Sequence, residues 1–152
     1  MKNTFVVGAV VLVLFSTGGA MAAGTDASQG KNTTTLPKTV NDLVKIDQKV
    51  GTGAKAIPPA QVDVYFSGWL YDPTKPDGHG AVIGGHSLFS ISFMLGNGDV
   101  ILGWEEGITG MKVGGKRTLI VPPHMGYGSD GAGVGVPPNA TLIFDVELLK
   151  VH

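Results

Sequence analysis

The sequence predicts an α+β fold in which an antiparallel β-sheet, curled into a half-barrel, wraps around one short α-helix. Apolar and polar residues alternate with period two in separate runs, as in strands that bury one face. Only one segment, near residues 97–110, places its apolar residues at helical spacing. Glycine, at 24 of 152 residues, gathers between these runs, where turns are expected. Strands that flank a single helix form an α+β domain.

Five runs are expected to form the strands. Pro122 and Pro123 end the fourth run, because proline cannot donate the hydrogen bond that a sheet requires. Segments 71–85 and 124–138 are rich in glycine and proline, so we expect two long loops there. In chain order the expected strands are residues 43–50, 62–70, 89–95, 116–121 and 142–148.

The helix is expected to start after Asn97 or Asp99, either of which can cap its first turn, and to end near Gly110. Glu105 and Glu106 lie opposite its apolar face, so we expect solvent around both. Trp104 is expected to meet Phe93 and Phe144 between helix and sheet. The apolar face carries Val100, Ile101, Trp104 and Ile108.

Composition excludes several functions. The net charge is −1 and the basic residues are scattered, which argues against a nucleic-acid partner. No cysteine is present, so disulfides, thiolate ligands and a catalytic thiol are excluded. The four histidines lack the spacing of a metal site. The Gly131-Ala132-Gly133 run has neither the preceding strand nor the following helix of a dinucleotide loop. We therefore expect no cofactor and no metal.

The N-terminus is expected to be a signal peptide, residues 1–22. Its apolar run, residues 5–15, is shorter than the ~20 residues of a membrane span. Ala20-Met21-Ala22 fits the signal-peptidase rule, with cleavage after Ala22 or Ala23. A retained, uncleaved anchor is the alternative. With cleavage the chain keeps no stable membrane anchor, and we expect a periplasmic or secreted protein.

Two further segments follow. Residues 23–39 are expected to be a flexible linker, because they are polar and almost without apolar residues. Residues 40–152 are expected to form the single folded domain. The linker is too short and too polar for a long dimerising helix, so we expect a monomer.

Several motifs in this domain resemble the FKBP-type peptidyl-prolyl cis-trans isomerases, in particular the exported bacterial type. The resemblance runs from about Val40 to the C-terminus, with the motifs in family order. It implies an FKBP-like half-barrel. The motifs are Phe93-Met94-Leu95-Gly96, Val100-Ile101 with Gly103-Trp104-Glu105-Glu106-Gly107, Met111-Lys112-Val113-Gly114, Tyr127-Gly128 and Pro137 to Leu149.

The resemblance implies an apolar pocket for a proline ring, with Trp104 as its floor. The backbone N–H of Ile101 would bind one substrate carbonyl, and the Tyr127 hydroxyl another. The implied catalytic residues are Tyr127, Phe144 and Trp104. The implied substrate-binding residues are Phe66, Ile83, Phe93, Val100, Ile101 and Val136. The implied partners are proline-containing polypeptides, with macrolide inhibitors as further ligands.

The implied function is isomerisation of Xaa-Pro peptide bonds during folding of exported proteins. Gly84 stands where the family usually has a pocket aspartate, with Ile83 in place of the preceding phenylalanine, so activity could be weakened. Phe66 stands at a pocket-wall position where the family usually has tyrosine, and Ile91 at one that is usually aromatic. In the loop after Tyr127, Ala132 and Gly135 stand where bulkier residues are common. The alternatives are a proline-binding chaperone or adaptor with little turnover, and a structural protein that reuses the fold.

Overall fold

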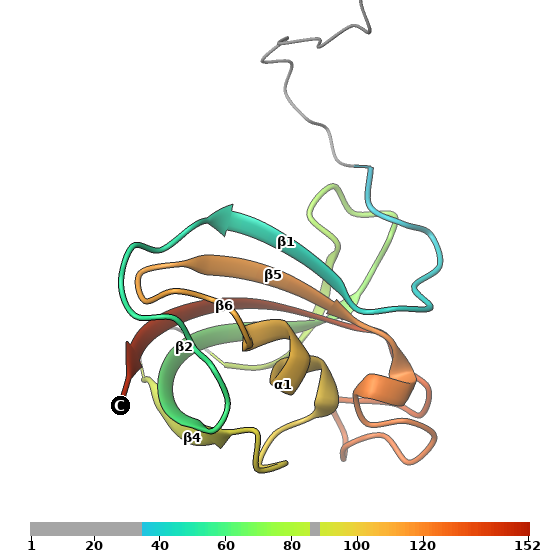
Figure 1. Cartoon of the computed structure of the whole chain (residues 1–152). Coiled ribbons are helices and arrows are strands. Elements are labelled where there is room, and N and C mark those ends of the chain that lie inside the picture. The colour runs from blue at the N-terminus through green and yellow to red at the C-terminus, as the bar shows by residue number, and fades with distance from the viewer. Residues whose placement is uncertain (1–34, 86–88) are drawn as a thin grey trace, which may run out of the picture. The chain divides into compact units, whose positions relative to one another are not determined.

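The computed structural model describes residues 35–85 and 89–152 (Figure 1). The expected signal peptide and residues 23–34 of the expected linker lie outside the described residues. Within the described part the elements are β1 Val44–Lys49, β2 Ala60–Tyr71, β3 His79–Gly84, β4 Ile91–Leu95, α1 Leu102–Ile108, β5 Lys116–Val121, the 3-10 helix η1 Pro123–Met125 and β6 Leu142–Val151.

The strands form one antiparallel sheet that curls over α1, as Figure 1 shows. Its order is β1-β5-β6-β2-β3, and β4 also pairs with β2. Along the edge that faces away from β6, the twelve-residue β2 has two partners: its first half pairs with β4 and its second half with β3. The expected half-barrel around one short helix is confirmed.

The helix lies close to β5 because two glycines face that strand. A Cβ atom built on Gly103 would lie 2.5 Å from the Val121 side chain. A Cβ atom built on Gly107, one turn later, would lie 2.6 Å from the side chain of Leu119. Neither distance leaves room for a larger residue. The two glycines thus set how deeply α1 sits in the curved sheet.

Arg117 fastens the end of the helix to the sheet. Its Nη1 donates to the carbonyl oxygen of Gly107 at 2.8 Å, and its Nε donates to Asp47 Oδ1 at 2.6 Å. The guanidinium group supplies a donor and a positive charge where helix carbonyls lack partners. One side chain therefore connects β1, β5 and the last turn of α1.

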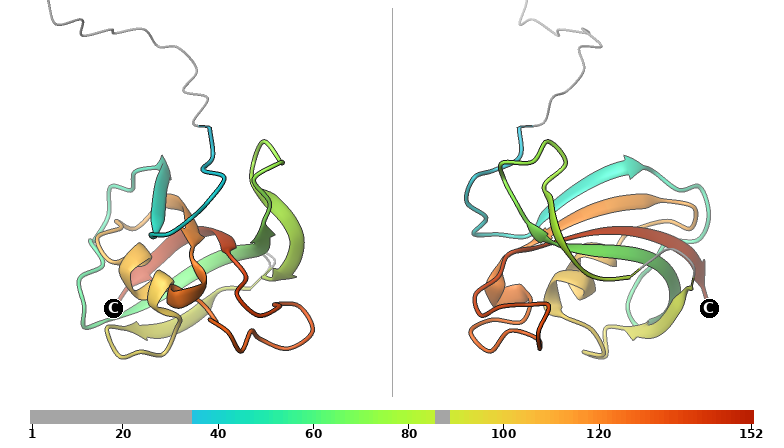
Figure 2. Two further views of the ribbon diagram at one scale, coloured as in Figure 1. Left: turned by 90° about the vertical axis from the view of Figure 1, so that its right-hand side faces the viewer. Right: turned by 180° about the vertical axis from the view of Figure 1, so that it is seen from behind.

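The expected loop over residues 71–85 is wrong in its second half, which forms β3. The sequence of β3 has no alternation of apolar and polar residues, so no strand could be predicted there. It forms because the end of β2 offers an open edge: Trp69 pairs with Val82, and Tyr71 with His79. Figure 2 shows this hairpin standing away from the helix.

The helix starts later than expected, at Leu102, and no side chain caps it. Asn97 and Asp99 instead belong to the turn after β4. The Asp99 carboxylate accepts hydrogen bonds from the N–H of Met94 at 3.2 Å and from Asn97 Nδ2 at 2.9 Å. The expected cap is wrong because this carboxylate closes the preceding turn.

Smaller differences occur elsewhere. Phe89, expected in the third strand, precedes β4 and is 81% exposed. The 3-10 helix η1 follows β5, where only the end of a strand and a loop were expected. The Tyr71 hydroxyl donates to the carbonyl oxygen of Pro37 at 2.6 Å, and burial raises the pKa of that hydroxyl. No helix in residues 35–85 and 89–152 has both the length and the apolar character needed to cross a membrane.

Candidate functional site

A cavity of about 460 Å³ opens on the inner face of the sheet, beside the start of α1. Its walls come from β2, β4, β6, the approach to α1 and the segment after η1. Six of the nine residues predicted from the sequence line it. The lining residues are Phe66, Ile91, Asp99, Val100, Ile101, Trp104, Tyr127 and Phe144.

Trp104 is held in place by three phenylalanine rings. Phe66 and Phe144 make T-shaped contacts with it, at centroid distances of 4.9 and 5.3 Å, and Phe93 is tilted against it at 5.8 Å. The expected meeting of Trp104, Phe93 and Phe144 is confirmed. Trp104 is 5% exposed, and its buried Nε1 has no hydrogen-bond partner among the described residues. Edge-to-face packing of this kind gives the cavity a fixed, apolar floor.

Three predicted residues lie outside the lining. Phe93 and Val136 are buried in the core, and Ile83 packs against that core while partly buried. Ile91 instead lines the cavity from β4. It precedes Phe93 by two residues, so both side chains lie on the same face of the strand. The period-two pattern placed both residues on one face, but it could not show which one reaches the opening.

The rim offers two hydrogen-bond donors that the described residues leave free. The backbone N–H of Ile101 lies just before α1 and donates to none of their acceptors. The Tyr127 hydroxyl likewise has no partner among them, and the side chain is 42% exposed. Tyr127 is positioned by its backbone, since its carbonyl accepts the N–H of Gly131 at 3.2 Å. An apolar cup with two free donors suits a ligand that carries a ring and carbonyl groups.

Gly84, which stands in place of an acid, is the last residue of β3 and lies outside the lining set. A Cβ atom built on it would have no heavy atom within 4 Å. The position is therefore open enough to accept an aspartate side chain.

Glu105 has a structural contact that the sequence did not predict. Glu106 is exposed, as expected, but the Glu105 carboxylate accepts the backbone N–H groups of Gly96 and Gly98. Two glycines closely preceding a helix with an acid in its first turn are the only signal, and such glycines are common.

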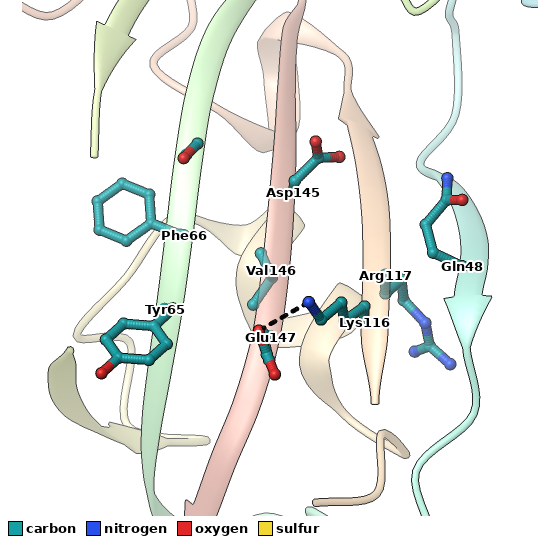
Figure 3. Close-up of a pocket in the computed structure, with 9 residues that line it drawn as sticks. Gln48, Tyr65, Phe66, Lys116, Arg117, Asp145, Val146 and Glu147 are labelled. Carbon is teal, nitrogen blue, oxygen red and sulfur yellow. Dashed lines mark ion pairs between the residues drawn. The ribbon is translucent and has the colours of Figure 1, made fainter. Parts of the chain in front are cut away.

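A second hollow, of about 260 Å³, lies where outward-facing residues of β2 and β6 meet β5 (Figure 3). Two of its charged side chains form an ion pair, with Lys116 Nζ 3.2 Å from Glu147 Oε2. Tyr65 and Ser67 alternate with Phe66 along β2, so they face away from the cavity over α1.

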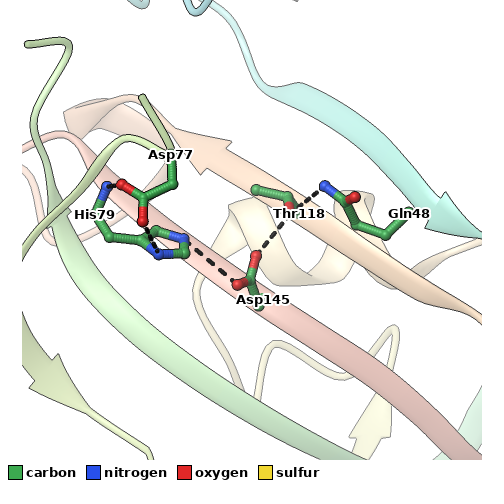
Figure 4. Close-up of polar contacts among 5 residues, drawn as sticks. All are labelled: Gln48, Asp77, His79, Thr118 and Asp145. Carbon is green, nitrogen blue, oxygen red and sulfur yellow. Dashed lines mark hydrogen bonds and ion pairs between the residues drawn. The ribbon is translucent and has the colours of Figure 1, made fainter. Parts of the chain in front are cut away.

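A row of polar contacts crosses this outer face (Figure 4). Gln48 Nε2 donates to Thr118 Oγ1 at 3.2 Å, and Thr118 Oγ1 donates to Asp145 Oδ1 at 2.6 Å. His79 follows, with Nε2 3.4 Å from Asp145 and Nδ1 3.3 Å from Asp77. The backbone N–H of His79 also lowers the pKa of Asp77.

The two hollows differ in what they leave for a ligand. On the outer face the charged groups pair with neighbouring side chains, and Gln48 and Thr118 join the same row of contacts, which favours a structural role. On the inner face the walls are apolar and the rim donors are free. The described residues also hold no group of three histidine, aspartate or glutamate side chains that could bind a metal. The inner cavity is therefore the candidate site.

Comparison with known proteins gives consistent results. A family model described as FKBP-type peptidyl-prolyl cis-trans isomerase matches residues 53–149. An FK506-binding protein of Neisseria meningitidis serogroup B is 46% identical over 110 residues, which cover 72% of this chain and 96% of that protein.

Two solved structures share the fold. The crystal structure of FkpA from Escherichia coli is similar with a TM-score of 0.61 and 38% identity, covering 72% of this chain and 47% of that one. The crystal structure of AtFKBP13 gives a TM-score of 0.62 and 32% identity, covering 72% and 93%. Since the family model spans more than half of the sequence, the chain belongs to the FKBP-type peptidyl-prolyl cis-trans isomerase family.

Proposed function

We propose that this peptidyl-prolyl cis-trans isomerase accelerates rotation about Xaa-Pro bonds while exported proteins fold, and that the inner cavity is its active site. One observation carries the assignment of the site: a buried tryptophan floor, fixed by phenylalanine rings, opens beside two free hydrogen-bond donors. The cavity has the apolar character that a proline ring needs, and the donors match peptide carbonyls.

The reaction fits a site without a nucleophile. Rotation about a peptide bond faces a barrier of about 18–20 kcal/mol, because C–N resonance must be broken. Only for Xaa-Pro bonds are the cis and trans forms close enough in energy for both to be populated. The twisted amide has less charge separation than the planar amide. An apolar cup therefore favours the twisted form relative to water, which lowers the barrier.

The residues divide the work between floor and rim. Trp104 and Phe144 would hold the proline ring, with Phe66 and Val100 beside them. The N–H of Ile101 and the hydroxyl of Tyr127 would each bind a carbonyl of the peptide, so that the proline ring and the chain before it are held while the bond between them rotates. Phe93, Ile83 and Val136 would act from behind, by supporting the walls.

A protease-coupled assay tests this function directly. The protein is purified after expression of the full 152-residue chain and added to a peptide that is cleaved only when its Xaa-Pro bond is trans. We expect the slow phase of cleavage to become faster in proportion to protein concentration. A rate equal to the uncatalysed rate at micromolar protein would refute catalysis.

Gly84 provides a sharper test of the rim. If a pocket acid helps, Gly84→Asp should raise kcat/KM several-fold, about 1 kcal/mol of transition-state stabilisation. Because a Cβ atom at Gly84 would have no heavy atom within 4 Å, we expect the variant to fold, so that a changed rate reports on the added acid. Equal rates for the two proteins would show that the missing acid is unimportant. Gly84→Asn, which adds a similar volume without the charge, is the matched control.

Export is the second part of the proposal. It is supported by the pattern of residues 1–22, with its short apolar run and small residues before Ala23. Mass spectrometry of the purified protein should find a chain that begins at Ala23 or Gly24, in the periplasmic or secreted fraction. A protein that keeps Met1 and sediments with membranes would support the retained anchor instead. Light scattering is expected to report a monomer.

Macrolides are proposed as competing ligands. The similar Neisseria protein is named an FK506-binding protein, and a macrolide of that kind would occupy the same cup as the proline ring. FK506 should therefore inhibit isomerisation competitively. Inhibition that raises KM in wild type and is absent in a Trp104 variant would support a shared site.

A proline-binding chaperone with little turnover is the second candidate. Three large apolar side chains near the loops are exposed: Val134 fully, Phe89 at 81% and Val82 at 56%. Exposed apolar surface of this kind can hold unfolded chains. Suppression of aggregation of a proline-free client, combined with no isomerase activity, would favour this candidate over the first.

A further inference from the structure

Glu105 reaches back from α1 to the turn after β4, and each of its carboxylate oxygens accepts one backbone N–H of that turn. Gly96 N donates to Oε2 at 2.6 Å, and Gly98 N donates to Oε1 at 2.9 Å. Both glycines have positive φ, 93° and 76°, a conformation that other residues rarely adopt. The turn thus presents two N–H groups to a single carboxylate. Such hydrogen bonds to a charged acceptor are stronger than those between neutral groups.

The segment that this turn leads into forms one side of the cavity. Asp99, Val100 and Ile101 are three successive lining residues between Gly98 and the start of α1. They belong to no regular element, and no side chain caps the helix that follows. The path of this segment is set by the turn, to which Asp99 also binds, by the packing of Val100 and Ile101 against the core, and by the helix.

Glu105 joins those two ends. It belongs to α1 and directly follows Trp104, the cavity floor, while its carboxylate binds the turn. The carbonyl oxygen of Ile101 is held by the N–H groups of Trp104 at 2.9 Å and Glu105 at 3.1 Å, whereas the Ile101 N–H belongs to the peptide bond on the side of the turn. Moving the turn away from α1 would therefore reorient this N–H relative to Trp104. The orientation of the rim donor over the floor thus depends on the Glu105 carboxylate.

We propose that Glu105 is a positioning residue for substrate binding, which holds the turn at residues 96–98 against α1 so that the N–H of Ile101 faces the substrate carbonyl. The inference rests on the proposed function of the cavity, because it concerns how that site binds a peptide. Glu105 does not touch the substrate. It acts through the backbone that does.

Glu105→Gln separates this role from simple packing. Glutamine has the same size, but it offers one acceptor oxygen and an NH₂ group that can only donate. One glycine N–H would then face another donor and lose its partner. Glu106→Gln is the matched control, since Glu106 is the next residue of the same helix, is exposed, and makes no hydrogen bond or ion pair among the described residues.

Steady-state kinetics gives the first readout. In Glu105→Gln, KM should rise about tenfold while kcat stays within about twofold, because a contact made equally in ground and transition states affects KM alone. A partly unfolded variant would instead show a lower kcat with an unchanged KM. Glu106→Gln should match wild type in both constants. Wild-type KM in folded Glu105→Gln would overturn the proposal.

Amide exchange gives a readout that needs no activity. At least one of the N–H groups of Gly96 and Gly98 should exchange with solvent faster in Glu105→Gln than in wild type or Glu106→Gln, because glutamine leaves one of them without an acceptor. Unchanged exchange would also overturn the proposal. If Glu105→Gln does not fold, Glu105→Asp replaces it, since aspartate keeps the charge but is too short to reach both groups. Without any wild-type activity, the proposed function fails, while exchange still tests the turn.

Discussion

The inner and outer faces of β2 and β6 are built from alternate residues of the same two strands, yet they are suited to different tasks. On the inner face, Phe66 and Phe144 pack their rings against Trp104 and leave a cavity with free donors at its rim. On the outer face, Asp145 and Glu147 hydrogen bond or pair with neighbouring strands (Figures 3 and 4). A hollow becomes a binding site only when its groups are not already satisfied within the protein.

The largest effect is expected when one tryptophan on each side of the sheet is replaced by leucine. Trp104→Leu removes the floor, so kcat/KM should fall about a hundredfold, which is about 2.7 kcal/mol, and stability should fall by about 2–4 kcal/mol. Trp69→Leu is the control, because Trp69 stacks on His79 at 3.8 Å on the outer face. It should leave kcat/KM unchanged. Peptide binding that survives in Trp104→Leu would show that the inner cavity is not the site.

A pair of tyrosines tests the rim donor. Tyr127→Phe removes a hydroxyl that has no partner among the described residues, so the melting temperature should not change. If the hydroxyl binds a peptide carbonyl, kcat/KM should fall about five- to tenfold, the value of one hydrogen bond of about 1 kcal/mol. Tyr65→Phe makes the same change in the outer hollow and should have no effect on catalysis. Equal losses in both variants would contradict the distinction between the faces.

The outer ion pair should contribute little. Glu147→Gln removes the contact with Lys116, but both side chains are partly exposed, at 34% and 54%. Water and salt screen such pairs, so we expect a loss of less than about 1 kcal/mol in unfolding free energy and no change in kcat/KM. Denaturant unfolding in low and high salt checks this. A larger loss, or an effect on catalysis, would mean that the outer hollow has a function of its own.

The smallest expected effect concerns Asp63, also on the outer side of β2. Its carboxylate accepts a hydrogen bond from Ser92 and lies 2.9 Å from His152 Nε2. The hydrogen bond from Ser92, followed by the contact with His152, lowers the pKa of Asp63 below the ordinary 3.8. A lowered pKa in the folded state means that ionised Asp63 stabilises the fold above pH 3.8, and that this stabilisation is lost as the pH falls through the lowered value.

Asp63→Asn should therefore lower the melting temperature slightly at pH 7, and the difference from wild type should shrink below about pH 4. Thermal unfolding followed by circular dichroism, at intervals of about one pH unit between about pH 2 and pH 7, measures this difference in melting temperature. A difference that grows in acid would have the wrong sign. Activity at pH 7 should be unaffected, because Asp63 is not among the residues that line the inner cavity.

Much of the fold could be predicted because its signals are local. The alternation in β6 and in the first half of β2 fixes which residues share a face, and the spacing of Trp104 and Ile108 identifies one helix. The strand β3 could not be predicted, because it depends on the edge of β2, whose residues pair with it across the hairpin, from Tyr71 with His79 to Gly68 with Gly84. The start of α1 was predicted wrongly for a similar reason. The Asp99 carboxylate could accept hydrogen bonds either from the first turn of the helix or from the turn after β4, and it binds the turn after β4.

The sequence by itself determined the curled antiparallel sheet, the single helix and the meeting of Phe93 and Phe144 with Trp104, since periodicity and residue type act over short stretches. Only the tertiary structure decided which of these residues reach the opening. It placed Ile91 in the lining and Phe93 in the core, and it left the N–H of Ile101 free. It also directed Glu105 onto the turn at residues 96–98. Exposure and hydrogen-bond partners depend on segments far apart in the chain, so no local pattern contains them.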